Sequence, residues 1–146
     1  MKVNLFVSKD IEEPYADIHT NELSENVTKA ISILESDESN DMLAVRKGSD
    51  IALLEFNDVY MIRVEEKQVK VYTKSNEYLI KKPLYQVEEN LNNDFVRISK
   101  TTIVNFKKIE RVAPSLKGMM FIQLKNGLKD NISRKYLPEF KKALDL

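Results

Sequence analysis

The most constraining feature of this sequence is a change in its hydrophobic pattern at Met42. Before that point, apolar residues follow helical spacing, at Leu23, Val27, Ala30, Ile31 and Leu34. After it, short β-prone runs follow one another at intervals of a few residues, with polar turns between them. Many short strands with frequent turns are typical of an all-β sandwich or barrel. The sequence therefore predicts a mainly β body over residues 41–146, preceded by a separate extension over residues 1–40.

The turn residues delimit the elements of the β body. Strands are predicted over residues 42–45, 50–56, 59–64, 68–72, 77–81, 95–98, 102–105, 109–113, 119–124 and 128–132. Asn126-Gly127 lies between the last two and is the strongest short-range hairpin signal in the chain. A short amphipathic helix is predicted over residues 84–91 after Pro83, and another over residues 134–146.

Residues 1–40 predict a small strand–strand–helix extension. Residues 3–7 alternate in polarity and residues 15–19 are predicted as a second short strand. A helix follows and ends near Glu35, and its N-terminal cap is expected from Thr20, Asn21 or Ser24. An acidic linker is predicted over residues 36–41. We expect the extension to be regulatory, to mediate dimerisation, or to add an edge strand and a packed helix to the β body.

The net charge of zero hides an uneven distribution. Residues 1–59 carry 5 Lys and Arg against 13 Asp and Glu, a net charge of −8, whereas residues 60–146 carry 18 against 10, a net charge of +8. A basic half of this kind indicates a polyanionic partner. The alternative is a dipolar soluble protein without a charged partner, since charge distribution alone does not determine association.

The residue inventory argues against most enzyme classes. The absence of cysteine excludes a disulfide framework, a thiolate metal site and a cysteine nucleophile, and a single histidine, His19, leaves no transition-metal cluster. Three glycines provide no phosphate-binding loop, and no serine lies in a G-x-S-x-G motif. The carboxylate pairs fall in polar turns, where solvation is the default. We therefore expect no enzyme activity, no metal and no cofactor.

No apolar run in the sequence approaches the roughly 20 residues that span a bilayer. The first ten residues lack the long apolar stretch and the small-residue cleavage site of a signal peptide. These observations, with the absence of cysteine, predict a cytoplasmic protein.

Several ordered motifs in the basic half resemble one family. The run over residues 95–105 matches the pattern F-x-R-x-H-x-S-x-x-V-N at Phe95, Arg97, Val104 and Asn105. The run over residues 132–136, Ile-Ser-Arg-Lys-Tyr, is similar to the closing V-S-R-x-Y signature of the same family. Together they resemble LytTR-type DNA-binding domains, over about residues 42–142.

This resemblance implies a fold and a mode of binding. LytTR domains are elongated stacks of small antiparallel sheets with one short helix, and loops at one edge enter successive major grooves without a recognition helix. The resemblance implies a sequence-specific transcription regulator that binds double-stranded DNA at direct-repeat sites as a dimer. Free-standing members without a receiver domain are often restrained by a membrane protein, which is a further expected partner. The alternative is a protein-interaction module that keeps the fold without binding DNA.

The family's contact positions map onto three loops of this chain. Arg134 is predicted to contact bases, because a guanidinium pairs bidentately with guanine O6 and N7. Lys100 and Lys67 are predicted to contact either bases or phosphates. The predicted phosphate contacts, which position a protein without reading sequence, are Ser99, Thr101, Lys107, Lys108, Lys129, Ser133 and Lys135. Arg97 and Asn105 also match the family, but we expect structural roles for both.

Overall fold

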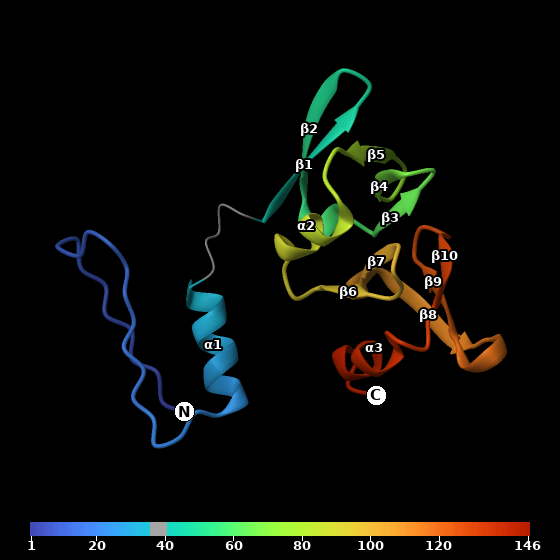
Figure 1. Cartoon of the computed structure of the whole chain (residues 1–146). Helices are drawn as coiled ribbons and strands as arrows, with labels where there is room; N and C mark the ends of the chain where they lie inside the picture. Colours follow the sequence, from blue (N-terminus) through green and yellow to red (C-terminus); the bar gives the residue numbers. More distant parts are fainter. Residues whose placement is uncertain (36–40) are drawn as a thin grey trace. The chain divides into compact units, whose positions relative to one another are not determined.

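The computed structural model describes residues 1–35 and 41–146 (Figure 1). The chain divides into two compact units, Met1–Asp37 and Glu38–Leu146. The linker predicted over residues 36–41 lies almost entirely outside the described residues.

The larger unit is mainly β, as the sequence predicts. Its strands are β1 (Met42–Lys47), β2 (Asp50–Glu55), β3 (Met61–Glu65), β4 (Gln68–Tyr72), β5 (Glu77–Ile80), β6 (Phe95–Arg97), β7 (Thr102–Asn105), β8 (Ile109–Pro114), β9 (Met120–Leu124) and β10 (Lys129–Ile132). Its helices are α2 (Leu84–Glu89) and α3 (Leu137–Ala143), with 3-10 turns η2 (Phe56–Asp58), η3 (Phe106–Lys108) and η4 (Leu116–Gly118).

The strands form two antiparallel sheets (Figure 1). The larger sheet has the order β2-β1-β5-β4-β3-β7-β6, and the smaller has the order β10-β9-β8. This mainly β architecture of antiparallel sheets with short helices confirms the predicted fold class, and α2 and α3 lie within the ranges predicted as helices. The larger sheet is extended because β1 joins β5 through a single register pair, Arg46 with Leu79, and carries β2 on its other side.

The alternation of side chains along β3 and β7 explains the layers. Met61 pairs with Val104 and Ile62 with Ile103, so neighbouring pairs face opposite sides of the sheet. Ile62 and Ile103 belong to a core closed by α2, whereas Met61 and Val104 belong to a second core with residues of β9, β10 and α3. All four side chains are at most 1% exposed. The large sheet is therefore buried on both faces at this point.

The smaller unit confirms the predicted helix but not the predicted strands. Helix α1 (Glu25–Glu35) begins after Ser24, whose hydroxyl accepts a hydrogen bond from the Val27 N–H at 3.3 Å. Residues 1–24 are all described and contain no strand, so the strands predicted over residues 3–7 and 15–19 are wrong for this structure. Alternating polarity favours an extended chain, but a strand also needs a neighbour for its backbone hydrogen bonds.

Most apolar side chains of the smaller unit remain exposed. The four apolar residues over residues 3–7 are between 82% and 89% exposed, and Leu23 is 75% exposed. Val27 is the only fully buried hydrophobic residue among residues 1–35. The predicted apolar stripe is therefore buried at Val27, partly buried at Ala30 and Ile31, and exposed at Leu23 and Leu34.

Candidate nucleic-acid interface

Three loops meet at one end of the large sheet. They are the β3–β4 turn, the β6–β7 loop over residues 98–101, and the segment after β10 over residues 133–136. The Val64 N–H donates to the Thr101 carbonyl at 2.8 Å, and the Ser133 N–H donates to the Ile98 carbonyl at 2.9 Å. We call this surface the loop edge, and it carries seven of the predicted contact residues: Lys67, Ser99, Lys100, Thr101, Ser133, Arg134 and Lys135.

The β3–β4 turn presents Lys67 on a tight two-residue connection. Glu65 pairs with Gln68, so Glu66 and Lys67 alone form the turn. Both have positive φ values, 50° and 64°. This backbone shape matches the twist of a hairpin but is uncommon for residues other than Gly, Asn and Asp. Lys67 is exposed at its tip.

Arg97 shapes the β6–β7 loop. Its guanidinium donates to the Ser99 carbonyl at 2.7 Å, to the Lys100 carbonyl, and to the Glu88 carboxylate of α2 at 2.9 Å. Within the loop, the Thr101 N–H donates to the Ser99 hydroxyl at 3.2 Å. Arg97 therefore pairs internally, as expected, and leaves the exposed Lys100 ammonium at the surface.

Asn105 supports the other end of β7. Its side chain is 1% exposed, donates to the Val59 carbonyl at 3.0 Å and accepts from the Lys107 N–H at 3.1 Å. The predicted structural role of Asn105 is therefore confirmed.

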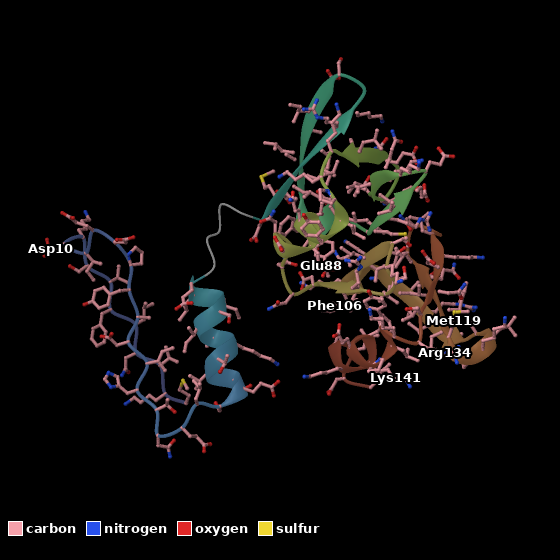
Figure 2. All side chains as sticks on the ribbon, viewed as in Figure 1. Asp10, Glu88, Phe106, Met119, Arg134 and Lys141 are labelled. Atoms are coloured by element: carbon pink, nitrogen blue, oxygen red, sulfur yellow. The ribbon has the colours of Figure 1, made fainter. Side chains whose placement is uncertain are left out.

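Arg134 follows the end of β10 and its side chain is exposed (Figure 2). None of the ion pairs among the described residues involves Arg134, Lys67 or Lys100. Lys135 lies next to Arg134, and its ammonium is 5.5 Å from the centre of the Tyr136 ring. The loop edge thus carries four cations, Lys67, Lys100, Arg134 and Lys135, that are free of carboxylate partners within the described part of the chain.

A polar cluster lies behind the loop edge and joins the two sheets. Asp130 of β10 accepts from Arg63 of β3 at 3.3 Å and from the Thr102 hydroxyl of β7 at 3.1 Å. Glu65 accepts from Arg63 at 2.7 Å and from the Tyr72 hydroxyl at 2.7 Å. These contacts connect the strands that carry the three loops, so they fix the positions of the loops relative to one another.

The cluster shifts the ionisation of its members. Partial burial opposes the charge of Glu65, but hydrogen bonds from Tyr72 and Arg63 outweigh it and lower the pKa of Glu65. Burial likewise opposes the charge of Arg63, but its contacts with Tyr72 and Glu65 raise the pKa of Arg63. Both residues therefore remain charged at neutral pH.

The other predicted contact residues do not reach the loop edge. Lys107 and Lys108 lie in η3, at the opposite end of β7, and Lys129 begins β10 at the opposite end from Ser133. The Lys107 ammonium is 3.2 Å from the Asp94 carboxylate, and the Lys108 ammonium lies 5.2 Å from the centre of the Tyr60 ring. We call this region the far end. Its contacts with DNA remain a prediction.

The structure also places basic residues that the sequence reasoning missed beside the loop edge. Lys81 and Lys82 follow β5, whose Ile80 pairs with Val69 at the start of β4. Together with Lys67 they line a cavity of about 510 Å³. Lys117 lies in η4, next to a glycine that contacts Arg134. The Lys-Lys pair is visible in the sequence, but only the strand register places it next to Lys67.

No helix in residues 1–35 or 41–146 has the length and apolar character needed to cross a membrane. Within the same ranges, no group of three or more His, Cys, Asp or Glu side chains is arranged to hold a metal ion.

Comparison with known proteins identifies the family. The LytTr DNA-binding domain family matches residues 49–145. Two Staphylococcus aureus proteins, from strains NCTC 8325 and COL, are both described as uncharacterised HTH-type transcriptional regulators. Each is 31% identical over 146 residues, covering 100% of this chain and 99% of the relative. A solved LytTr DNA-binding domain from Bacillus cereus has the same fold, with a TM-score of 0.69 and 20% identity, over 73% of this chain and 98% of that one. The chain therefore belongs to the LytTR family of DNA-binding domain proteins.

Proposed function

We propose that this protein is a cytoplasmic, sequence-specific transcription regulator that binds double-stranded DNA through the loop edge. The observation that carries the proposal is that three loops meet at one end of the large sheet, with cations that have no carboxylate partner in residues 1–35 or 41–146. Residues 41–146 carry 20 Lys and Arg against 14 Asp and Glu, a net charge of +6, which favours a polyanion. The members of this family are DNA-binding proteins, and we propose no catalytic activity for the chain.

The seven residues of the loop edge divide into two roles. Arg134 reads a base, because its guanidinium is exposed, has no carboxylate partner among the described residues and can pair bidentately with guanine. Lys67 and Lys100 contact bases or phosphates from the two neighbouring loops. Hydroxyl and ammonium groups contact phosphates and set the register of the protein on the duplex, at Ser99, Thr101, Ser133 and Lys135.

The smaller unit supplies a surface for assembly. Its apolar side chains over residues 3–7 are exposed, and a unit of this size without disulfides or metals is usually stabilised by association. The Staphylococcus aureus relatives cover the whole chain, so residues 1–40 have a counterpart in those regulators. We propose that this unit supports a homodimer on direct-repeat sites. A membrane protein that restrains the regulator is the other partner we would test for at this surface.

Selection of bound duplexes from a random pool tests the proposal directly. The purified full-length chain should enrich a defined sequence, and its affinity should fall linearly with salt on a logarithmic scale, because bound cations displace counterions from DNA. Binding that is absent at low ionic strength would contradict the proposal and favour a protein-interaction module. Enrichment without a preferred sequence would retain DNA binding but remove base reading.

A further inference from the structure

The loop between β8 and β9 contacts the side chain proposed to read bases. A Cβ atom placed on Gly118 would lie 3.2 Å from Cδ and 3.7 Å from Cγ of Arg134. The shorter distance is less than the ordinary carbon–carbon contact of roughly 3.5–4.0 Å. The aliphatic part of Arg134 therefore lies beside Gly118, in space that a side chain at this position would partly fill. Figure 2 labels Arg134 and also Met119, which follows Gly118.

This loop is fixed to the strand that leads to Arg134. The Ser115 N–H donates to the Met119 carbonyl at 2.9 Å and closes the loop. The Ser115 hydroxyl donates to Asn131 of β10 at 3.3 Å. Lys117 and Gly118 both have positive φ values, 58° and 75°, which turn the backbone sharply. The segment beside Arg134 is therefore joined to β10 by a side-chain hydrogen bond.

We propose that Gly118 is a positioning residue for Arg134 in base recognition. The inference rests on the proposed function, in which Arg134 contacts a base. An exposed arginine loses much rotamer freedom when it binds, and this loss weakens binding. A backbone surface against its aliphatic part limits the rotamers available before binding. Gly118 thereby holds the guanidinium in a direction suited to bidentate contact with guanine.

The test compares Gly118 with Gly127, because both glycines have a positive φ. Gly118→Ala adds a methyl group against Arg134, whereas Gly127→Ala adds one in the β9–β10 turn, where φ is +90° and no atom lies within 4 Å. Both substitutions strain the backbone, but only the first displaces Arg134. Gly118→Asn provides a second variant, because asparagine tolerates a positive φ better than alanine.

The measured quantity is the ratio of affinities for the selected duplex and for random DNA. We expect Gly118→Ala and Gly118→Asn to lower this ratio by about threefold to tenfold, a part of the loss expected for Arg134→Ala. Gly127→Ala should leave the ratio unchanged. In an Arg134→Ala background, Gly118→Ala should have no further effect on the ratio.

Three results would overturn the inference. The first is an equal loss for the two glycine positions, which would reflect turn strain alone. The second is an undiminished effect of Gly118→Ala in the Arg134→Ala background, which would show that the loop contacts DNA independently of Arg134. The third is wild-type discrimination in both Gly118 variants. By contrast, a wild-type protein without sequence preference would overturn the proposed function itself.

Discussion

The two ends of β7 carry the same kinds of residue in different surroundings. At the loop edge, Lys100 is exposed and has no carboxylate partner within the described residues. At the far end, Lys107 is paired with Asp94 and Lys108 lies over the ring of Tyr60. A lysine that must first leave a protein partner gains less from a phosphate than a free one. Proximity in the sequence therefore does not make lysines equivalent as DNA contacts.

The contacts that hold the loop edge and the far end in place differ as well. The loop edge rests on charged hydrogen bonds that cross between the sheets, through Asp130, Arg63 and Thr102. The far end has the partly exposed ion pair between Lys107 and Asp94 and neutral amide contacts, such as the Asn126 side chain donating to the Thr73 carbonyl at 3.0 Å. Charge-assisted hydrogen bonds are stronger than neutral ones. We expect the geometry of the loop edge to be the more firmly held of the two.

The largest expected effect is on sequence-specific binding, and it distinguishes base recognition from the general attraction of cations to DNA. Arg134→Ala should weaken binding to the selected duplex by about 1–3 kcal/mol and relax the preference at one base position. Lys108→Ala, the matched removal of a far-end cation, should leave sequence preference intact. Competition binding against duplexes varied at each position measures both. If random DNA loses as much affinity as the selected duplex, Arg134 contacts only phosphate and the distinction between the ends is one of charge alone.

The second prediction concerns the hydrogen bonds that hold the loop edge in place. Asp130→Ala removes the acceptor shared by Arg63 and Thr102 and should lower the free energy of unfolding by about 1–2 kcal/mol. Because the same contacts hold the loops together, specific DNA binding should also weaken. Asn126→Ala should destabilise the far end while leaving specific binding unchanged. Denaturant titration measures the free energy of unfolding of both variants, and binding assays measure their affinity for the selected duplex. Equal affinities would show that Asp130 does not hold the loop edge in place.

A smaller effect is expected in the salt dependence. Lys135→Ala should flatten the slope of log affinity against log salt by about 0.9, the value for one lost phosphate contact. Lys107→Ala should flatten it less, because Lys107 already pairs with Asp94. Titrations on random duplex at several salt concentrations provide the slopes. An equal change for the two variants would place the far end in contact with DNA.

The smallest effect should appear in acid. The fold lowers the pKa of Glu65, so this group stabilises the folded state above its unfolded pKa of about 4.3 and loses that contribution as the pH falls below it. The contribution should be about 0.2–1 kcal/mol, as for partly exposed ion pairs. Unfolding free energies of the wild type and Glu65→Gln should therefore differ at pH 6 and converge near pH 3. A constant difference across that range would exclude the charge of Glu65 as the cause.

The local elements were predictable because their signals lie within a few residues. The bounds of β4 and β7 agree with the sequence prediction, since polar turn residues bracket each strand. The cap of α1 was predictable for the same reason, because Ser24 accepts from a residue only three positions away.

The meeting of the loops depends on contacts that sequence spacing does not reveal. Asp130 reaches Arg63 across 67 positions and Thr102 across 28. The resemblance to LytTR domains indicated which loops carry contacts, but it also included Lys107, Lys108 and Lys129, which the strand order places elsewhere. The prediction of N-terminal strands was wrong for a related reason. The alternation over residues 3–7 indicates a preference for an extended backbone, whereas strand pairing needs a neighbouring strand that no local pattern specifies.

Each loop of the loop edge closes a different pair of strands or follows a different hairpin. A substitution in one loop can therefore change its contact while the other two loops and both cores keep their geometry. In the proposed mode of binding, the preferred operator would therefore drift one base at a time, without a variant that first loses its fold. A regulator that binds in this way would acquire new target genes through single substitutions, and duplicated copies would diverge in specificity from a common framework.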